Sequence, residues 1–227
     1  MITQGVQARN VAMRIAIVMR IASVLLVTFP GSAVFAQEPT VPFVDPPHEL
    51  ERASVDLDED TRGWIVRAKV HARVLEWDVA ESLFRRAHER YPEDGYIQFA
   101  LGTALIETHK HREAVELLVP LVERFPNHPS LLNNLAWLFG KTEDEDVKDL
   151  KRASGYAQAA LVASPDSPLI WSTATEIYYQ RGEFNQALSM AGVAVGLARG
   201  LRIENISDFV DLQERCARAV RAMEILE

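Results

Sequence analysis

A set of small, aromatic and proline residues recurs at a fixed interval, and this recurrence constrains the fold more than any other feature of the chain. Between residues 61 and 94 the set comprises Ala68, Ala80, Phe84, Ala87 and Pro92. Thirty-four residues later the same places hold Gly102, Ala114, Leu118, Leu121 and Pro126. A period in the range of about 20–50 residues is typical of arrays of one repeated supersecondary unit. The chain is therefore predicted to be a stack of similar units.

With Trp64 at the fourth place and Pro92 at the thirty-second, the spacing resembles the tetratricopeptide repeat (TPR), a helix–turn–helix unit of about 34 residues. The resemblance implies four repeats, at 61–94, 95–128, 129–167 and 168–201. It also implies an all-α fold, a right-handed α-solenoid of about four TPR helix pairs. Each pair buries its apolar face only against its neighbours, so the pairs stack.

The first repeat is expected to contain helices at Arg62–Leu75 and Val79–Arg90. Trp77 and Asp78 would form the turn between them, with Asp78 as the cap of the second helix. In the second repeat Pro120 falls inside the second helix, where proline removes one backbone hydrogen bond. We expect a kink there rather than a break, because apolar residues resume directly afterwards.

The third and fourth repeats carry their own turn signals. The third is five residues longer than the period, and the extra residues fall between Gly140 and Asp149. In the fourth, Arg181–Phe184 is the expected turn, with Gly182 able to adopt a positive φ.

Residues 205–227 are predicted to form a last helix that caps the array, beginning at Asn205 or Ser207. Its apolar stripe has helical spacing and comprises Phe209, Leu212, Cys216, Ala219, Met223 and Leu226. Cys216 is the only cysteine, so the chain has no internal disulfide, and its place on the stripe predicts a buried, unreactive thiol.

Residues 1–36 have the features of a secretory signal. They contain three arginines and no acidic residue, and the apolar run Ile21–Phe29 follows the last arginine. Val34 and Ala36 stand at the two places that a signal peptidase reads, so we expect cleavage after Ala36. The protein would then be periplasmic or secreted.

The alternative for the leader is an uncleaved membrane anchor. Ile21–Ala36 is 16 residues long and is interrupted by Pro30-Gly31. A spanning helix needs about 20 apolar residues. This length favours cleavage, and no transmembrane span is expected in the mature chain.

Residues 37–60 are predicted to form a proline-rich acidic tether. Its prolines lack an amide donor and restrict the residue before them, which disfavours regular structure. Acidic residues crowd its second half. The alternative is a short helix from Pro47 to Val55 that packs on the first repeat.

No arrangement of residues supports catalysis or a cofactor. His109 and His111 flank Lys110, but they fall in a predicted turn, where polar residues are ordinary. The acids of Glu143–Asp146 are consecutive and lack the central Gly of a calcium loop. No Gly-rich phosphate loop or nucleophile–base pair is present, so no enzyme, cofactor or metal site is expected. Without the three leader arginines the formal net charge falls from −8 to −11, which argues against a nucleic-acid partner.

In TPR proteins the first helix of each pair forms a concave groove. Carried over by repeat position, the resemblance assigns nine residues to this groove: Lys69, Arg73, Tyr96, Phe99, Thr103, Asn133, Trp137, Glu176 and Tyr179.

Several of these residues suit a protein ligand. Lys69 and Arg73 are four apart on one helix face, and Trp137 and Tyr179 are of the types enriched in binding hot spots. The alternatives are that Trp137 packs between repeats and that the basic pair is solvated. Ile65 stands where a lysine–asparagine clamp for C-terminal carboxylates would begin, so that clamp is not expected.

The sequence thus predicts an exported, non-catalytic TPR adaptor or scaffold. It would bind an extended or helical protein segment in its groove, with envelope assembly or secretion as the setting. One alternative is a self-associating structural component that uses the C-terminal helix. Another is an accessory subunit of an enzyme.

Overall fold

The structure is a computed structural model that describes residues 56–226. The predicted signal 1–36, the predicted tether as far as residue 55 and the alternative helix 47–55 lie outside the described residues. The side chain of Leu226, the last member of the predicted apolar stripe, does so as well.

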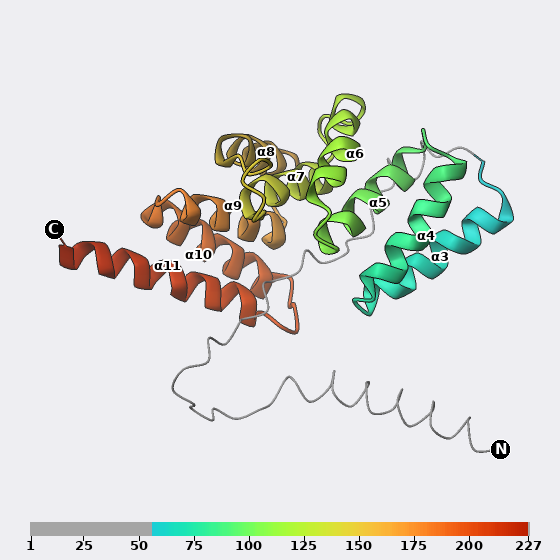
Figure 1. The fold of residues 1–227 in the computed structure, drawn as a ribbon. Helices are drawn as coiled ribbons and strands as arrows, with labels where there is room; N and C mark the ends of the chain where they lie inside the picture. Colours follow the sequence, from blue (N-terminus) through green and yellow to red (C-terminus); the bar gives the residue numbers. More distant parts are fainter. Residues whose placement is uncertain (1–55, 227) are drawn as a thin grey trace, which may run out of the picture. The chain divides into compact units, whose positions relative to one another are not determined.

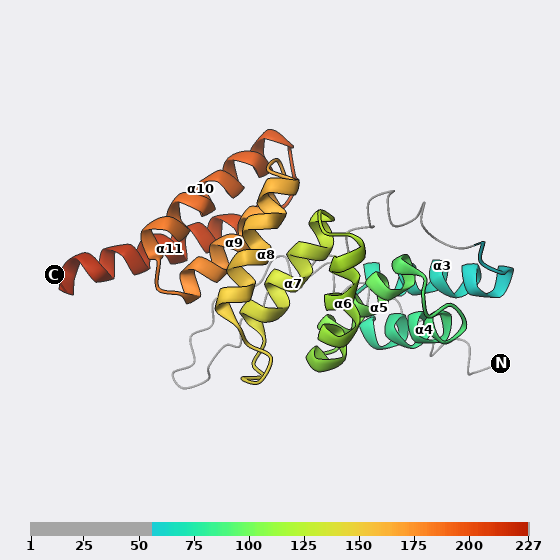
Figure 2. The ribbon, with the colours of Figure 1, turned by 90° about the horizontal axis from the view of Figure 1, so that it is seen from above.

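Helices form all the regular structure within residues 56–226, and no strand occurs there. In chain order they are α3 (Glu59–Arg73), α4 (Trp77–Arg90), α5 (Gly95–Glu107), α6 (His111–Arg124), α7 (Pro129–Lys141), α8 (Leu150–Ala163), α9 (Pro168–Gln180), α10 (Phe184–Gly200) and α11 (Ser207–Leu226). Consecutive helices pack as the pairs α3–α4, α5–α6, α7–α8 and α9–α10, and each pair packs on the next (Figure 1, Figure 2). The predicted all-α solenoid is confirmed.

The first helix of each pair begins at a side-chain cap. The caps are Asp58, Asp94, His128 and Ser167, each of which accepts a hydrogen bond from the backbone N–H three residues on. Because Asp58 caps α3, Glu59 and Asp60 belong to the helix, and the predicted tether boundary at residue 60 is too late. The two acids lie in the first turn, where the helix dipole favours negative charge.

The turn inside the first pair is centred on Leu75 and not on Trp77 and Asp78. Leu75 has a left-handed φ of 60°, as has His109 at the same place of the second pair. Trp77 starts α4 and is 7% exposed, since its indole packs into the core. The predicted turn and the predicted Asp78 cap were therefore wrong. Gly182 has the expected positive φ, 78°.

The structure tests two predicted irregularities, and the kink expected at Pro120 stays a prediction. α6 continues through Pro120 without a break. α7 ends at Lys141 and α8 begins at Leu150, so the extra residues of the third repeat form the linker between the two helices of its pair.

Small residues stand where the two helices of a pair cross. Ala68 of α3 and Ala80 of α4 are fully buried, and so is Ala114 of α6. A Cβ atom on Gly102 of α5 would overlap the side chain of Leu118, which is itself fully buried. The spacing of small residues in the sequence therefore reflects close helix contact.

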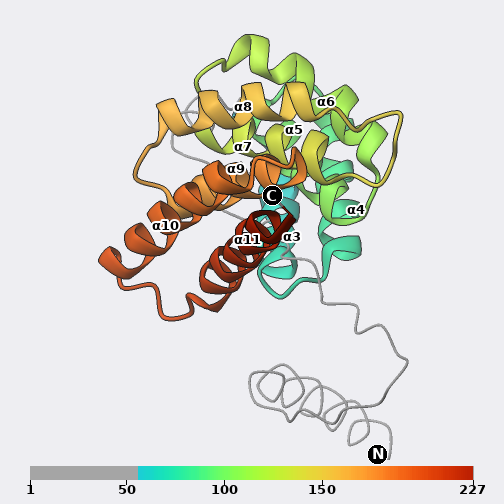
Figure 3. The same ribbon diagram turned by 90° about the vertical axis from the view of Figure 1, so that its left-hand side faces the viewer.

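The last helix, α11, packs mainly on α10 and also touches α9, as the predicted cap should (Figure 3). Cys216 is fully buried at this contact, and burial raises the pKa of its thiol. Towards the C-terminus, Met223 and Ile225 are exposed. None of the described helices combines the length and the apolar character needed to cross a bilayer.

Candidate functional site

The nine predicted groove residues, called the inner wall below, lie on α3, α5, α7 and α9. These are the first helices of the four pairs, and α7 contacts both α5 and α9. The buried members of the wall are Tyr96, Phe99, Thr103 and Asn133, each at most 5% exposed. Lys69, Trp137, Glu176 and Tyr179 are half-buried, and Arg73 is exposed. Much of the wall is therefore packed side chain.

The part of the wall formed by α3, α5 and α7 is held by contacts between these helices. The Lys69 Nζ atom lies 5.9 Å from the centre of the Tyr96 ring, within the range of a cation–π contact. Asn134 Nδ2 donates a hydrogen bond of 2.9 Å to Thr103 Oγ1, which in turn donates to the backbone oxygen of Phe99. These contacts join successive repeats along the wall.

Asn133 stands out on α7 because its side-chain oxygen is buried and accepts no hydrogen bond within the described part of the chain. The residue is 4% exposed. Buried polar atoms almost always have a partner, so an acceptor in this position favours a donor from outside residues 56–226. Because the atom is closed to solvent, a backbone N–H of a bound segment reaches it only when the side chains that cover it move aside.

The part of the wall formed by α7 and α9 contains a shared ion cluster. Glu176 accepts from Lys141 Nζ at 3.1 Å and from Arg215 of α11. The side chains of Lys141 and Glu176 are only 9% and 13% exposed. The Arg215 guanidinium also lies 4.7 Å from the centre of the Tyr179 ring. Glu176 and Tyr179 are thus engaged by the capping helix.

Sequence reasoning did not assign Arg215 to the wall, because it treated α11 as a separate cap. The only signal was its place beside Cys216 on the border of the apolar stripe. A charged residue at such a border can reach a helix beside the main contact, here α9, while the stripe packs mainly on α10.

Trp137 is half-buried and packs against the main apolar core. This supports the alternative that its ring fills space between repeats, while part of the ring remains at the surface of α7. Arg73, by contrast, is an exposed residue at the end of α3.

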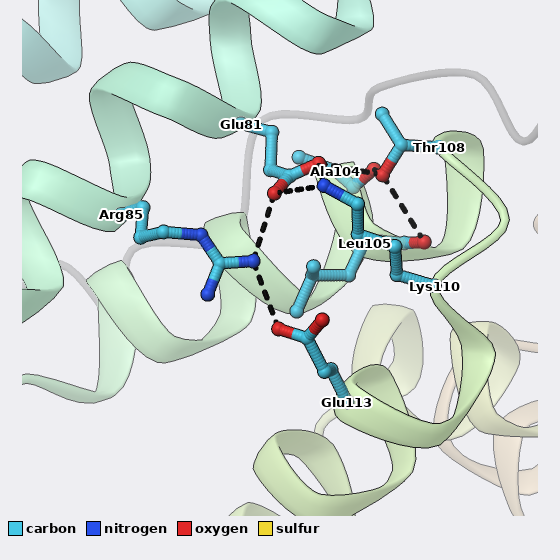
Figure 4. A network of polar contacts seen from close by, with 7 residues as sticks. All are labelled: Glu81, Arg85, Ala104, Leu105, Thr108, Lys110 and Glu113. Atoms are coloured by element: carbon cyan, nitrogen blue, oxygen red, sulfur yellow. Dashed lines mark hydrogen bonds and ion pairs between the residues drawn. The ribbon is translucent and has the colours of Figure 1, made fainter.

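A second polar cluster joins the first two repeats (Figure 4). Glu81 of α4, with a side chain 5% exposed, accepts from Lys110 Nζ at 2.7 Å and from Thr108 Oγ1 at 2.8 Å. It also accepts from Arg85, which donates to Glu113 as well. Burial alone would raise the pKa of Glu81, but the bonds from these donors outweigh it and lower the pKa. Every charge in this cluster is paired, so its role is to hold the two repeats together.

The residues weighed as metal ligands are engaged in contacts of other kinds. The His109 and His111 rings meet edge to face at 5.7 Å, and His111 Nδ1 lies 2.7 Å from Thr142 Oγ1. In the acidic linker, Asp144 and Asp146 both accept hydrogen bonds from Arg112. Within residues 56–226 no group of three or more His, Cys, Asp or Glu side chains is arranged to hold a metal ion.

Comparison with known proteins identifies the repeat. Residues 76–138 match the family model described as tetratricopeptide repeat. A search of curated protein sequences found no match.

Solved structures extend this likeness over most of the chain. TTC0263, a thermophilic TPR protein in Thermus thermophilus, aligns with a TM-score of 0.54 at 18% identity, over 70% of this chain and 98% of that one. MamA from Desulfovibrio magneticus RS-1 aligns with a TM-score of 0.51 at 13% identity, over 73% and 97% of the two chains. At such identities the likeness concerns the fold.

Proposed function

We propose that the chain, which is a tetratricopeptide-repeat protein, serves as an exported scaffold that binds a segment of a partner protein along its inner wall. Proteins of this fold act in general as non-catalytic interaction scaffolds. The bound segment would lie across α5, α7 and α9, where half-buried Trp137 and Tyr179 offer flat apolar contact.

The observation that carries the proposal is the unsatisfied acceptor of Asn133. The amide lies in the middle of the inner wall, on the third of its four helices. A peptide backbone running along the wall would supply an N–H donor once the side chains that cover this atom have moved aside. Lys69 and Arg73, at the first helix, favour an acidic residue at one end of that segment.

The described ionisable groups do not form an acid–base pair of the kind that catalysis uses. Burial shifts the pKa values of His88, His111 and Cys216. Bonds with charged partners on neighbouring elements shift the pKa values of Glu81, Asp144 and Arg112. Such pairs position helices. This supports a binding role over an enzymatic one.

Export is part of the proposal and rests on residues 1–36. Their basic start, apolar run and small residues before position 37 are those of a cleaved signal. In the periplasm or outside the cell, a scaffold of this kind would serve envelope assembly or secretion.

Site-specific photo-cross-linking in the producing cell tests the inner wall. A benzophenone amino acid placed at Tyr179 or at Trp137 should capture the same protein. The same probe at Glu116, an exposed residue of α6, should not capture it. Capture of one protein from all three positions, or of none, would refute the proposed groove.

The charge pair gives a second test on the captured partner. Lys69→Glu with Arg73→Glu should abolish its binding while helicity and melting stay nearly unchanged. A matched pair on α11, Arg218→Glu with Arg221→Glu, should leave binding intact, because both residues are exposed away from the wall.

Self-association through α11 is the second candidate function. Met223 and Ile225 of α11 are 45% and 83% exposed, and apolar surface at the end of a solenoid favours association. Size-exclusion chromatography of the processed chain should then give a dimer that Ile225→Glu converts to a monomer. A monomer at every concentration would exclude this candidate.

A further inference from the structure

The first helix of the array has an exposed apolar face. Val66 and Val70 of α3 and Val74, the residue that follows the helix, are spaced four apart, so they lie on one side together with Gly63. Their exposed fractions are 60%, 55% and 61%. Nowhere else in the described chain are three large apolar side chains exposed at helical spacing.

The same positions are buried in every later pair. The counterparts of Gly63, Val66 and Val70 in α5 are Ile97, Ala100 and Ala104, all 0% exposed. In α7 they are Leu131, Asn134 and Leu138, at most 4% exposed. In α9 they are Ile170, Thr173 and Ile177, at most 6% exposed. The face is therefore a contact surface between repeats wherever a preceding repeat exists.

A helix covers this face in each of those pairs. α5 packs on α4, α7 packs on α6 and α5, and α9 packs on α8 and α7, so the covering elements are helices of the preceding pair. Hydrogen bonds that cross these contacts are Thr108 to Glu81 (2.8 Å), Thr142 with His111 (2.7 Å) and Arg181 to Ser154 (2.5 Å). Among the described helices, α4 alone makes extensive contact with α3.

Basic side chains border the exposed face. On the helix surface, Arg62 and Arg73 lie along one edge of the valine stripe and Arg67 along the other. The acidic residues of α3 are Glu59 and Asp60 in its first turn, and from Thr61 to Leu75 the chain has arginine and lysine residues but no acidic residue. An element that covers the valines is therefore favoured when it carries acidic side chains at its borders.

We propose that the face formed by Gly63, Val66, Val70 and Val74 is a docking site for an amphipathic helix of a partner protein, whose apolar stripe is bordered by acidic side chains. The guest is a helix because helices cover the equivalent face of α5, α7 and α9. Gly63 has no atom within 4 Å of the place of a Cβ, which leaves room for a close approach. The four residues of the face are not members of the inner wall, although Arg73 borders both surfaces, and the proposal does not depend on that wall.

The test uses two designed peptides and the full-length chain. Each peptide is a labelled helix of about five turns with a leucine stripe; one has glutamates beside the stripe and the other has lysines. Fluorescence anisotropy should give a dissociation constant for the acidic peptide at least about tenfold lower than for the basic one. Equal affinities, or no binding of the acidic peptide, would overturn the proposal.

Variants of the chain locate the binding. Val70→Asp should weaken binding of the acidic peptide by about tenfold or more. The new carboxylate replaces apolar surface that the peptide buries on binding, and it repels the glutamates of the peptide. Arg67→Glu, which alters only an exposed side chain, should weaken binding of the acidic peptide by about threefold. Ile225→Asp, at a more exposed apolar residue of α11, should have no effect. A Val70→Asp chain that keeps its helicity and full affinity would overturn the proposal.

Cross-linking decides which element occupies the face in the cell. A benzophenone amino acid at Val70 should attach to a segment of another protein that has an apolar helical stripe with acidic borders. Attachment to residues 1–55 of the same chain, to a second copy of the chain, or to nothing would each overturn the proposal.

Discussion

α3 and α5 occupy the same place in successive repeats, yet they are buried to very different extents. In α3 four of 15 residues are buried, and in α5 eleven of 13 are. α5 lies between α4 on one side and α6 and α7 on the other, whereas α3 packs extensively on α4 alone among the described helices. In a solenoid, stability is a sum of contacts between neighbours, so the same position can carry a large or a small share of it.

The largest difference is expected for truncations of apolar side chains. Leu105→Ala in α5 removes a side chain that is 2% exposed and should reduce the free energy of unfolding by about 3 kcal/mol. Val66→Ala in α3, at a residue 60% exposed, should change it by no more than about 0.5 kcal/mol. Urea denaturation followed by circular dichroism measures both. Similar losses for the two variants would contradict the comparison.

Each of the two helices also contains a glycine that tests its surroundings, although the two glycines occupy different places of the repeat. Gly102→Ala in α5 should destabilise the protein by about 2 kcal/mol, because the new methyl group overlaps buried Leu118. Gly63→Ala in α3 meets open space and should stabilise it by about 0.5 kcal/mol, since alanine favours helix. Thermal melting of both variants should therefore give shifts of opposite sign.

Substitutions in the Glu81 cluster test how strongly polar contacts hold the first two repeats together. Glu81→Ala removes the acceptor shared by Lys110, Arg85 and Thr108 and should cost about 1–2 kcal/mol. Glu113→Ala is the control, because Glu113 binds the same Arg85 but its side chain is 50% exposed. That variant should lie within about 0.5 kcal/mol of the parent. An equal effect of the two would mean that burial does not set the strength of this cluster.

The smallest expected effect is a pH dependence of stability that arises at the contact between the second and third repeats. Burial, with a contribution from neighbouring His109, lowers the pKa of His111 below its usual 6.5. The unfolded chain therefore binds the proton more readily, and His111 contributes stability above about pH 6.5 that is lost as the pH falls through the folded-state pKa.

Melting temperatures between pH 7.5 and pH 5 check this dependence. The parent should lose stability on acidification, and His111→Gln should lose less. His88, whose pKa burial also lowers, should account for part of the remaining slope. An unchanged slope in His111→Gln would exclude His111 as a source.

Predictions that depended on local sequence agree best with the structure. The glycine turn at Gly182, the unbroken helix at Pro120 and the linker after Lys141 follow from backbone preferences of residues a few positions apart. The turn before α4 was misplaced because Leu75 adopts a left-handed φ that leucine rarely shows. Packing of Trp77 into the core offsets the free-energy cost of the left-handed backbone at Leu75.

The candidate site was less predictable than the fold. Repeat position identified the helices of the inner wall, but it did not reveal that Tyr96, Phe99 and Thr103 are buried. It also missed the contact between Arg215 and Glu176, which are 39 residues apart in the chain. Such contacts depend on how far each helix is displaced along its neighbour, and repeat spacing does not specify that displacement.

The sequence by itself determined the period, the helical pairs and the small residues at their crossings, because these follow from backbone geometry and from side-chain volume at fixed places of the repeat. Only the tertiary structure decided which copies of a repeated position are covered. Val66 and Ala100 hold the same place, and the second is buried because α4 lies against it. Burial, and with it binding capacity, depends on neighbours that the repeat pattern does not distinguish.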